Sequence, residues 1–113
     1  MTVQKLEKEQ WRSFFDRVSK GLKGKQAEIE IASLDLGDQV AAEWLPLFGI
    51  VYEPKSDVLE VALEGVDHMI HKPREIYIDN GAQTLTSVEI IDAEGTKQIV
   101  RLRDPLMLPP PAR

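Results

Sequence analysis

Apolar positions near the start of the chain repeat with the period of an α-helix. Five large side chains fall at i, i+3, i+4, i+7 and i+11 and therefore share one stripe: Trp11, Phe14, Phe15, Val18 and Leu22. We predict a helix over residues 8–21, with Glu7 as its N-cap and Leu6 packed on Trp11. Because three of the chain's seven aromatic residues lie on this stripe, the helix should belong to the core.

After residue 24 the apolar period changes to 2, which is typical of strands that bury one face. Residues 57–64 show it most clearly, since Leu59, Val61 and Leu63 fall on one face and Glu60 and Glu64 on the other. We place strands at about residues 25–34, 39–45, 48–53, 57–64, 74–79, 84–92 and 97–103. In the second of them Val40, Ala42 and Trp44 should face inward, and Pro46 should end or bulge it.

The predicted fold class is α+β. The N-terminal helix packs on a twisted, mostly antiparallel sheet of six to seven short strands, which could close towards a small barrel. Antiparallel pairing follows from the turn chemistry between strands and from the lack of crossover helices. A chain of 113 residues should form a single domain, 1–113. The tail, 104–113, should be neither helix nor central strand, with Leu106, Met107 and Leu108 over a core edge or docked on a partner.

Composition excludes several classes of protein. The chain has no cysteine, which excludes disulfides, thiolate metal sites and cysteine nucleophiles. No window approaches the length of a membrane span, and the first residues lack the apolar core of a signal peptide. We therefore expect a cytoplasmic protein that does not contact membranes.

Charge is distributed unevenly along the chain. Residues 1–25 carry seven Lys/Arg against three Asp/Glu, whereas the rest carries seven against sixteen. A basic arm could mark a nucleic-acid contact, but the acidic remainder would oppose phosphate binding. We expect no nucleic-acid partner and place the basic helix on its own acidic sheet.

Both histidines lie in one polar segment between predicted strands, and this is the first place to look for chemistry. His68 and His71 are three residues apart, so a helical turn would let them share a metal with Glu64 or Asp67. Lys72 and Arg74 follow directly and could hold a carboxylate or phosphate. The simpler alternatives are structural histidines and an Arg74 paired with acids on neighbouring strands. We therefore expect no metal.

The same segment should fold as a turn. We predict a turn or single helical turn over residues 67–74, with Met69 or Ile70 anchored in the core. Pro73 should restrict Lys72 to extended backbone.

The chain resembles a bacterial family described as a domain of unknown function, number 5335. The matching pieces run along nearly the whole chain, at residues 10–17, 35–39, 46–50, 63–76 and 89–96. The resemblance implies an accessory protein of bacteria, and it carries no activity, cofactor or catalytic residue onto this sequence.

Three functions remain, in order of preference. The first is a non-enzymatic cytoplasmic binding or accessory protein without a cofactor, acting on an unknown protein or small molecule, with homodimerisation left open. The second is a small-ligand or anion-binding domain that uses His68, His71 and Arg74. The third is a metal-dependent enzyme. No catalytic residue can be named from the sequence.

Overall fold

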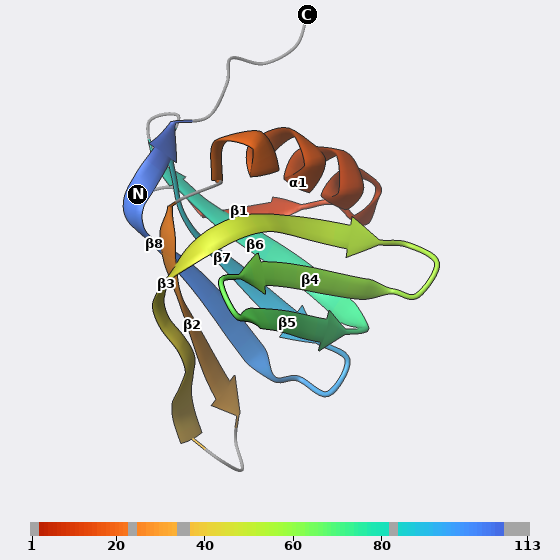
Figure 1. Ribbon diagram of the computed structural model, residues 1–113. Helices are drawn as coiled ribbons and strands as arrows, with labels where there is room; N and C mark the ends of the chain where they lie inside the picture. Colours follow the sequence, from red (N-terminus) through yellow and green to blue (C-terminus); the bar gives the residue numbers. More distant parts are fainter. Residues whose placement is uncertain (1–2, 23–24, 34–36, 82–83, 108–113) are drawn as a thin grey trace, which may run out of the picture.

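One helix and eight strands make up the described part of the chain, residues 3–22, 25–33, 37–81 and 84–107 of a computed structural model (Figure 1). The helix α1 spans Lys8–Leu22. The strands are β1 Val3–Leu6, β2 Gln26–Ser33, β3 Gly37–Glu53, β4 Val58–Leu63, β5 Val66–His71, β6 Pro73–Gly81, β7 Thr84–Asp92 and β8 Lys97–Met107.

The strands form one antiparallel sheet in the order β1-β6-β7-β8-β2-β3-β4-β5. With the helix packed on it, the fold is α+β, as predicted. The described sheet has eight strands, so the expected six to seven was too few. The sheet does not close into a barrel, because β1 and β5 end it without pairing with each other.

Helix α1 forms where its apolar stripe predicted it. All five stripe residues are buried, and the rings of Trp11 and Tyr52 meet edge to face, 5.1 Å apart. Gln10 Oε1 accepts from the N–H of Glu7 at 3.3 Å, so Glu7 and Gln10 cap the first turn. The helix packs mainly along β3 (Figure 1) and is therefore part of the core.

Strand β3 is continuous over the two separate strands that were predicted at about residues 39–45 and 48–53. Its first half pairs with β2 and its second half with β4, and the register shifts near Trp44, which has a φ of +50°. Strand β3 does not end at Pro46, where it passes from one partner to the other. The alternative, a bulge, agrees with the register shifts on both sides of Pro46, between residues 42 and 45 against β2 and between 47 and 49 against β4. Of the side chains expected inward, Ala42 is buried, Trp44 is half-buried and Val40 is exposed. Val40 lies opposite Glu30 in the β2–β3 hairpin, whose turn end projects beyond the other strands (Figure 1).

Two strands and one extension were not predicted. Strand β1 pairs with β6 and strand β5 pairs with β4. Strand β8 continues to Met107, with Leu106 opposite Leu85, so residues 104–107 are strand and not tail. The expectation that the side chains of Leu106, Met107 and Leu108 cover an edge of the core concerns side chains outside the described part of the structure.

The core lies between the two halves of the bent sheet and below α1. In Figure 1, β3, β4 and β5 pass in front of β6, β7 and β8, and α1 crosses the top. Each strand contributes its inward-facing row to one cluster, including Ile29, Leu59, Leu63, Ile70, Ile76, Leu85, Ile90 and Val100.

Ser19 of α1 covers the unpaired edge of the second half of β3. Its hydroxyl donates to the carbonyl of Ile50 at 2.8 Å and accepts from the N–H of Ile50 at 3.0 Å. An added Cβ on Gly49 would lie 3.3 Å from this hydroxyl oxygen, so a small residue is needed for the close approach. A helix side chain thus takes the place of a neighbouring strand at Ile50.

Ser19→Ala should lower the free energy of unfolding by about 1–3 kcal/mol, because the N–H and C=O of Ile50 would both lose their partner. Ser13→Ala is the matched control, since its exposed hydroxyl bonds only within the helix, to the carbonyl of Gln10. Urea denaturation of both variants measures the difference. Equal stabilities would show that Ser19 contributes nothing at this edge.

Candidate functional site

The segment that holds the two histidines is a strand and not a turn. Residues 66–71 form β5, in continuous register with β4. Ile70 is fully buried, which confirms it as an anchor, whereas Met69 is 47% exposed and lies outside the core. The chain reverses between β5 and β6 at the single residue Lys72, whose φ of +52° contradicts the expected extended backbone.

Because side chains alternate along a strand, His68 and His71 point to opposite faces of the sheet. His68 faces inward, where its Nε2 lies 2.5 Å from Oε1 of Gln98 on β8. His71 is exposed on the outer face. Within the described residues, no group of three or more His, Cys, Asp or Glu side chains is placed to hold a metal ion. The two histidines therefore do not form a common site.

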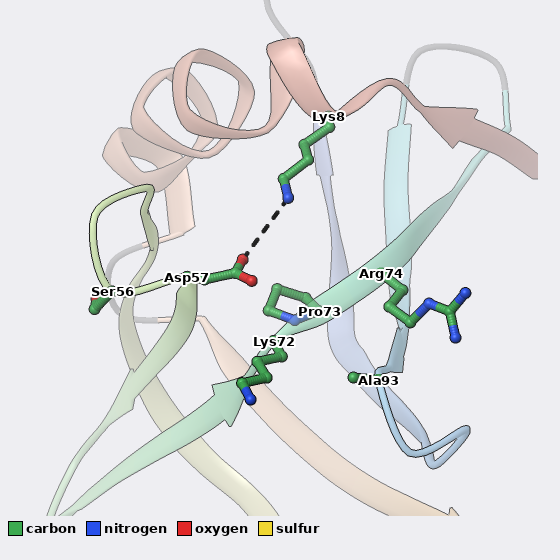
Figure 2. Close-up of a pocket in the computed structure, with 7 residues that line it drawn as sticks. All are labelled: Lys8, Ser56, Asp57, Lys72, Pro73, Arg74 and Ala93. Carbon is green, nitrogen blue, oxygen red and sulfur yellow. Dashed lines mark ion pairs between the residues drawn. The ribbon is translucent and has the colours of Figure 1, made fainter.

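Arg74 lines an open concavity of about 440 Å³. Its walls come from the start of α1, the β3–β4 turn, the β5–β6 junction and the β7–β8 turn, through Lys8, Ser56, Asp57, Lys72, Pro73, Arg74 and Ala93 (Figure 2). Arg74 is the extra residue of a β-bulge, since Pro73 pairs with Asp92 and Glu75 with Ile91. A bulge redirects the side chain that it carries, so the local irregularity places this guanidinium at the rim.

A second concavity of about 530 Å³ adjoins the first and shares Lys8 and Asp57 with it. Its remaining lining is Glu9, Arg12, Tyr52 and Pro54. The two together form one surface around the N-terminal end of α1, with polar and apolar parts.

Asp57 is the acidic centre of this surface. Its Oδ1 accepts from the hydroxyl of Tyr52 at 2.7 Å and lies 4.0 Å from Nζ of Lys8. Burial, and after it the hydrogen bond to Asp57, together raise the pKa of Tyr52 from 10.0 to about 12. Lys8 also lies 5.7 Å from the centre of the Trp11 ring. These contacts leave Asp57 with two partners and fix the β3–β4 turn against the helix.

The cations on the other side of the first concavity have no such partner. Within the described residues, neither Lys72 nor Arg74 forms an ion pair, so the expected pairing of Arg74 with acids across the sheet is absent there. Both side chains are exposed, and in Figure 2 they extend on either side of Pro73, away from Asp57.

Two left-handed residues meet at this concavity. Asp57 and Lys72 have φ values of +55° and +52°, a region that residues with a Cβ seldom adopt. The N–H of Lys72 donates to the carbonyl of Asp57 at 2.8 Å, and the carbonyl of Lys72 accepts from the N–H of Ala93 at 2.9 Å. Surrounding hydrogen bonds thus hold a strained backbone in place, as is common at functional sites.

Comparison with known proteins identifies the family of the chain. A family model described as "Family of unknown function (DUF5335)" matches residues 2–111. The chain belongs to this family. An "Uncharacterized protein" of Aquifex aeolicus (strain VF5) is 39% identical over 110 residues, which cover 96% of this chain and 99% of that protein. No solved structure matches the chain.

For this DUF5335 member, the sequence alone pointed to one wall of the concavity and missed the rest. Lys72 and Arg74 were found because they follow the histidines. Lys8 and Asp57 were not, because only the topology brings the start of α1 to the β3–β4 turn. The described part of the chain contains no helix that is long and apolar enough to cross a membrane.

Proposed function

We propose that the protein is a small non-enzymatic binding protein of the bacterial cytoplasm that holds a small anion at the first concavity. The ligand is a carboxylate or a phosphate, and Lys72 and Arg74 are its principal contacts, with Lys8 at the far wall. One observation carries the proposal. Two exposed cations, which have no ion-pair partner among the residues that the structure describes, are placed at a concavity by a left-handed residue and a bulge.

The chemistry of these cations suits a carboxylate or phosphate. A guanidinium presents paired N–H donors to such a group, and an ammonium adds a point charge. Lys72 and Arg74 have long side chains, so both can fold over Pro73 to reach one anion. Because the surface is open to solvent, water and salt screen the attraction, and a modest affinity is expected.

The non-enzymatic part of the proposal rests on the histidines and the carboxylates. General acid–base catalysis needs a proton-transferring group within hydrogen-bond reach of the substrate. His68 is engaged with Gln98 on the inner face, and His71 lies on the outer face of β5. Glu28 and Glu30 approach each other on β2, but Arg101 lies between them and lowers the pKa of Glu30 through its hydrogen bond. A cytoplasmic location is supported by the lack of cysteine, which leaves no need for an oxidising compartment.

Orthophosphate and citrate should raise the melting temperature, because a ligand that binds only the folded state stabilises it. Each anion is compared with potassium chloride at equal ionic strength, and the double variant Lys72→Gln/Arg74→Gln should lose the shift. Arg17→Gln/Lys20→Gln is the matched control, since it removes two positive charges from exposed positions of α1 outside both concavities. It should retain the shift.

Two results would contradict the proposal. The first is that neither anion raises the melting temperature of the natural chain beyond the value in chloride. The second is that the Lys72/Arg74 variant shows the same shift as the control variant.

A further inference from the structure

Strand β5 ends the sheet and leaves one row of backbone groups without a neighbouring strand. The N–H of Lys72 donates to the carbonyl of Asp57, which makes Asp57 and Lys72 a hydrogen-bonded pair of the β4–β5 ladder. Because such pairs alternate in antiparallel strands, Ile70 and His68 also bond to β4. The backbone groups of Asp67, Met69 and His71 therefore point to the free edge.

The side chains of the same three residues lie on the outer face of the sheet, and all three are exposed. Met69 is 47% exposed, and the register places it in a row with Glu60 of β4 and Val51 of β3. Val51 is 46% exposed. Met69 thus lies at the middle of the free edge. Asp67 precedes it by two residues along the strand, and His71 follows it by two.

Two other edges are protected in ways that β5 is not. The second half of β3 is covered by Ser19 of α1. Strand β1 has four residues and carries an exposed Lys5, and short edge strands with lysine resist pairing with other chains. Strand β5 has six residues, without proline, lysine or a bulge in its register with β4.

We propose that β5 pairs with β5 of a second copy of this chain, in antiparallel orientation around a two-fold axis at Met69. In this register Met69 lies opposite the partner's Met69, and Asp67 lies opposite the partner's His71, with the reverse pair on the other side. All three pairs use backbone groups that point to the free edge, so each exchanges two hydrogen bonds.

Complementary side chains select this register and this partner. Asp67 discourages pairing with an arbitrary strand, as charged residues on edges do. When β5 pairs with itself about Met69, however, each Asp67 carboxylate lies opposite the His71 imidazole of the other copy, and a ring N–H can donate a hydrogen bond to a carboxylate oxygen. Shifting the axis by one residue to His68 would place Asp67 opposite Met69 and lose both pairs. The interface is isologous and closes as a dimer.

The dimer proposal does not depend on the anion site. It is tested by measuring the oligomeric state of the protein in solution. Sedimentation velocity over the micromolar to millimolar range should show a reversible dimer of the natural chain. Met69→Lys should give a monomer, because two cations would meet at the axis. Val51→Lys is the matched control, since Val51 is equally exposed on the same face but lies two strands from the edge, and it should remain dimeric.

The register has its own test. Asp67→His should raise the dimer dissociation constant at least tenfold, and the exchanged variant Asp67→His/His71→Asp should restore it, because each histidine again meets an acid. Circular dichroism verifies that each variant is folded. A natural chain that stays monomeric at millimolar concentration would overturn the proposal, as would a dimer that survives Met69→Lys. An exchanged variant no better than Asp67→His would overturn the register.

Discussion

Phe15→Ala should lower the free energy of unfolding by about 3–5 kcal/mol, the cost of truncating a buried aromatic side chain. Phe15 is fully buried on the inner face of α1, and its ring meets that of Phe14 edge to face, 5.3 Å away. The other residues of the stripe are themselves buried, so the truncation should leave a cavity. Urea denaturation at neutral pH measures the loss.

Phe48→Ala provides the matched control. The chemical change is identical, but Phe48 is 51% exposed on β3, so its loss should be within about 1 kcal/mol. Deleting residues 1–22 should have a still larger effect and leave a chain without a cooperative melting transition, since β1 and the whole apolar stripe would be absent. A truncated chain that melts cooperatively, or a Phe15→Ala variant as stable as Phe48→Ala, would show that α1 is an appendage.

Folding stability should fall by about 2 kcal/mol as the pH rises from 10 to 12, through the ionisation of Tyr52. Its pKa is raised from the ordinary value of 10.0 to about 12, because burial and Asp57 both disfavour the phenolate. A group with a raised folded pKa contributes its stability fully below the unfolded pKa and loses it as the pH rises through the folded pKa. The contribution is therefore complete at neutral pH and lost only in alkali.

Tyr52→Phe separates this effect from the general alkaline loss. At neutral pH the variant should be less stable by about 1–3 kcal/mol, because Asp57 loses a charge-assisted hydrogen bond. Towards pH 12 the difference from the natural chain should disappear. Tyr77→Phe is the comparison, since the hydroxyl of Tyr77 bonds to Glu75 at the surface and its removal should cost less at neutral pH. If the Tyr52→Phe difference were constant from neutral pH to pH 12, the Tyr52 hydroxyl would not be the titrating group.

The helix could be predicted from the sequence and strand β5 could not, for one physical reason. The signal in α1 is local, since five large apolar residues repeat at helical spacing and are all buried. In β5 the usual alternation is reversed at its centre. The polar His68 faces inward because Gln98 satisfies it, and the apolar Met69 faces outward. A pattern that assigns apolar residues to the core therefore gives no strand there, and Pro73 strengthens the impression of a turn.

The candidate site was predictable only in part, because its walls are far apart in the sequence. Lys72 and Arg74 stand next to the histidines and attracted attention for that reason. Lys8 and Asp57 are 49 residues apart and meet because β3 carries the chain along α1 before the β3–β4 turn. No local pattern encodes that meeting, and the bulge at Arg74 depends on the register between β6 and β7.

The place of β2 in the sheet has a consequence for synthesis in the cell. Strand β2 pairs with β3, which follows it directly, and with β8, so that Ala27 lies opposite Leu102. Because the chain is synthesised from its N-terminus, the second edge of β2 stays unpaired until residues 97–102 have emerged. Pairings so distant in sequence slow folding, and an open strand edge in a nascent chain invites aggregation. The growing polypeptide therefore gains most from a chaperone during the interval between the emergence of β3 and that of β8.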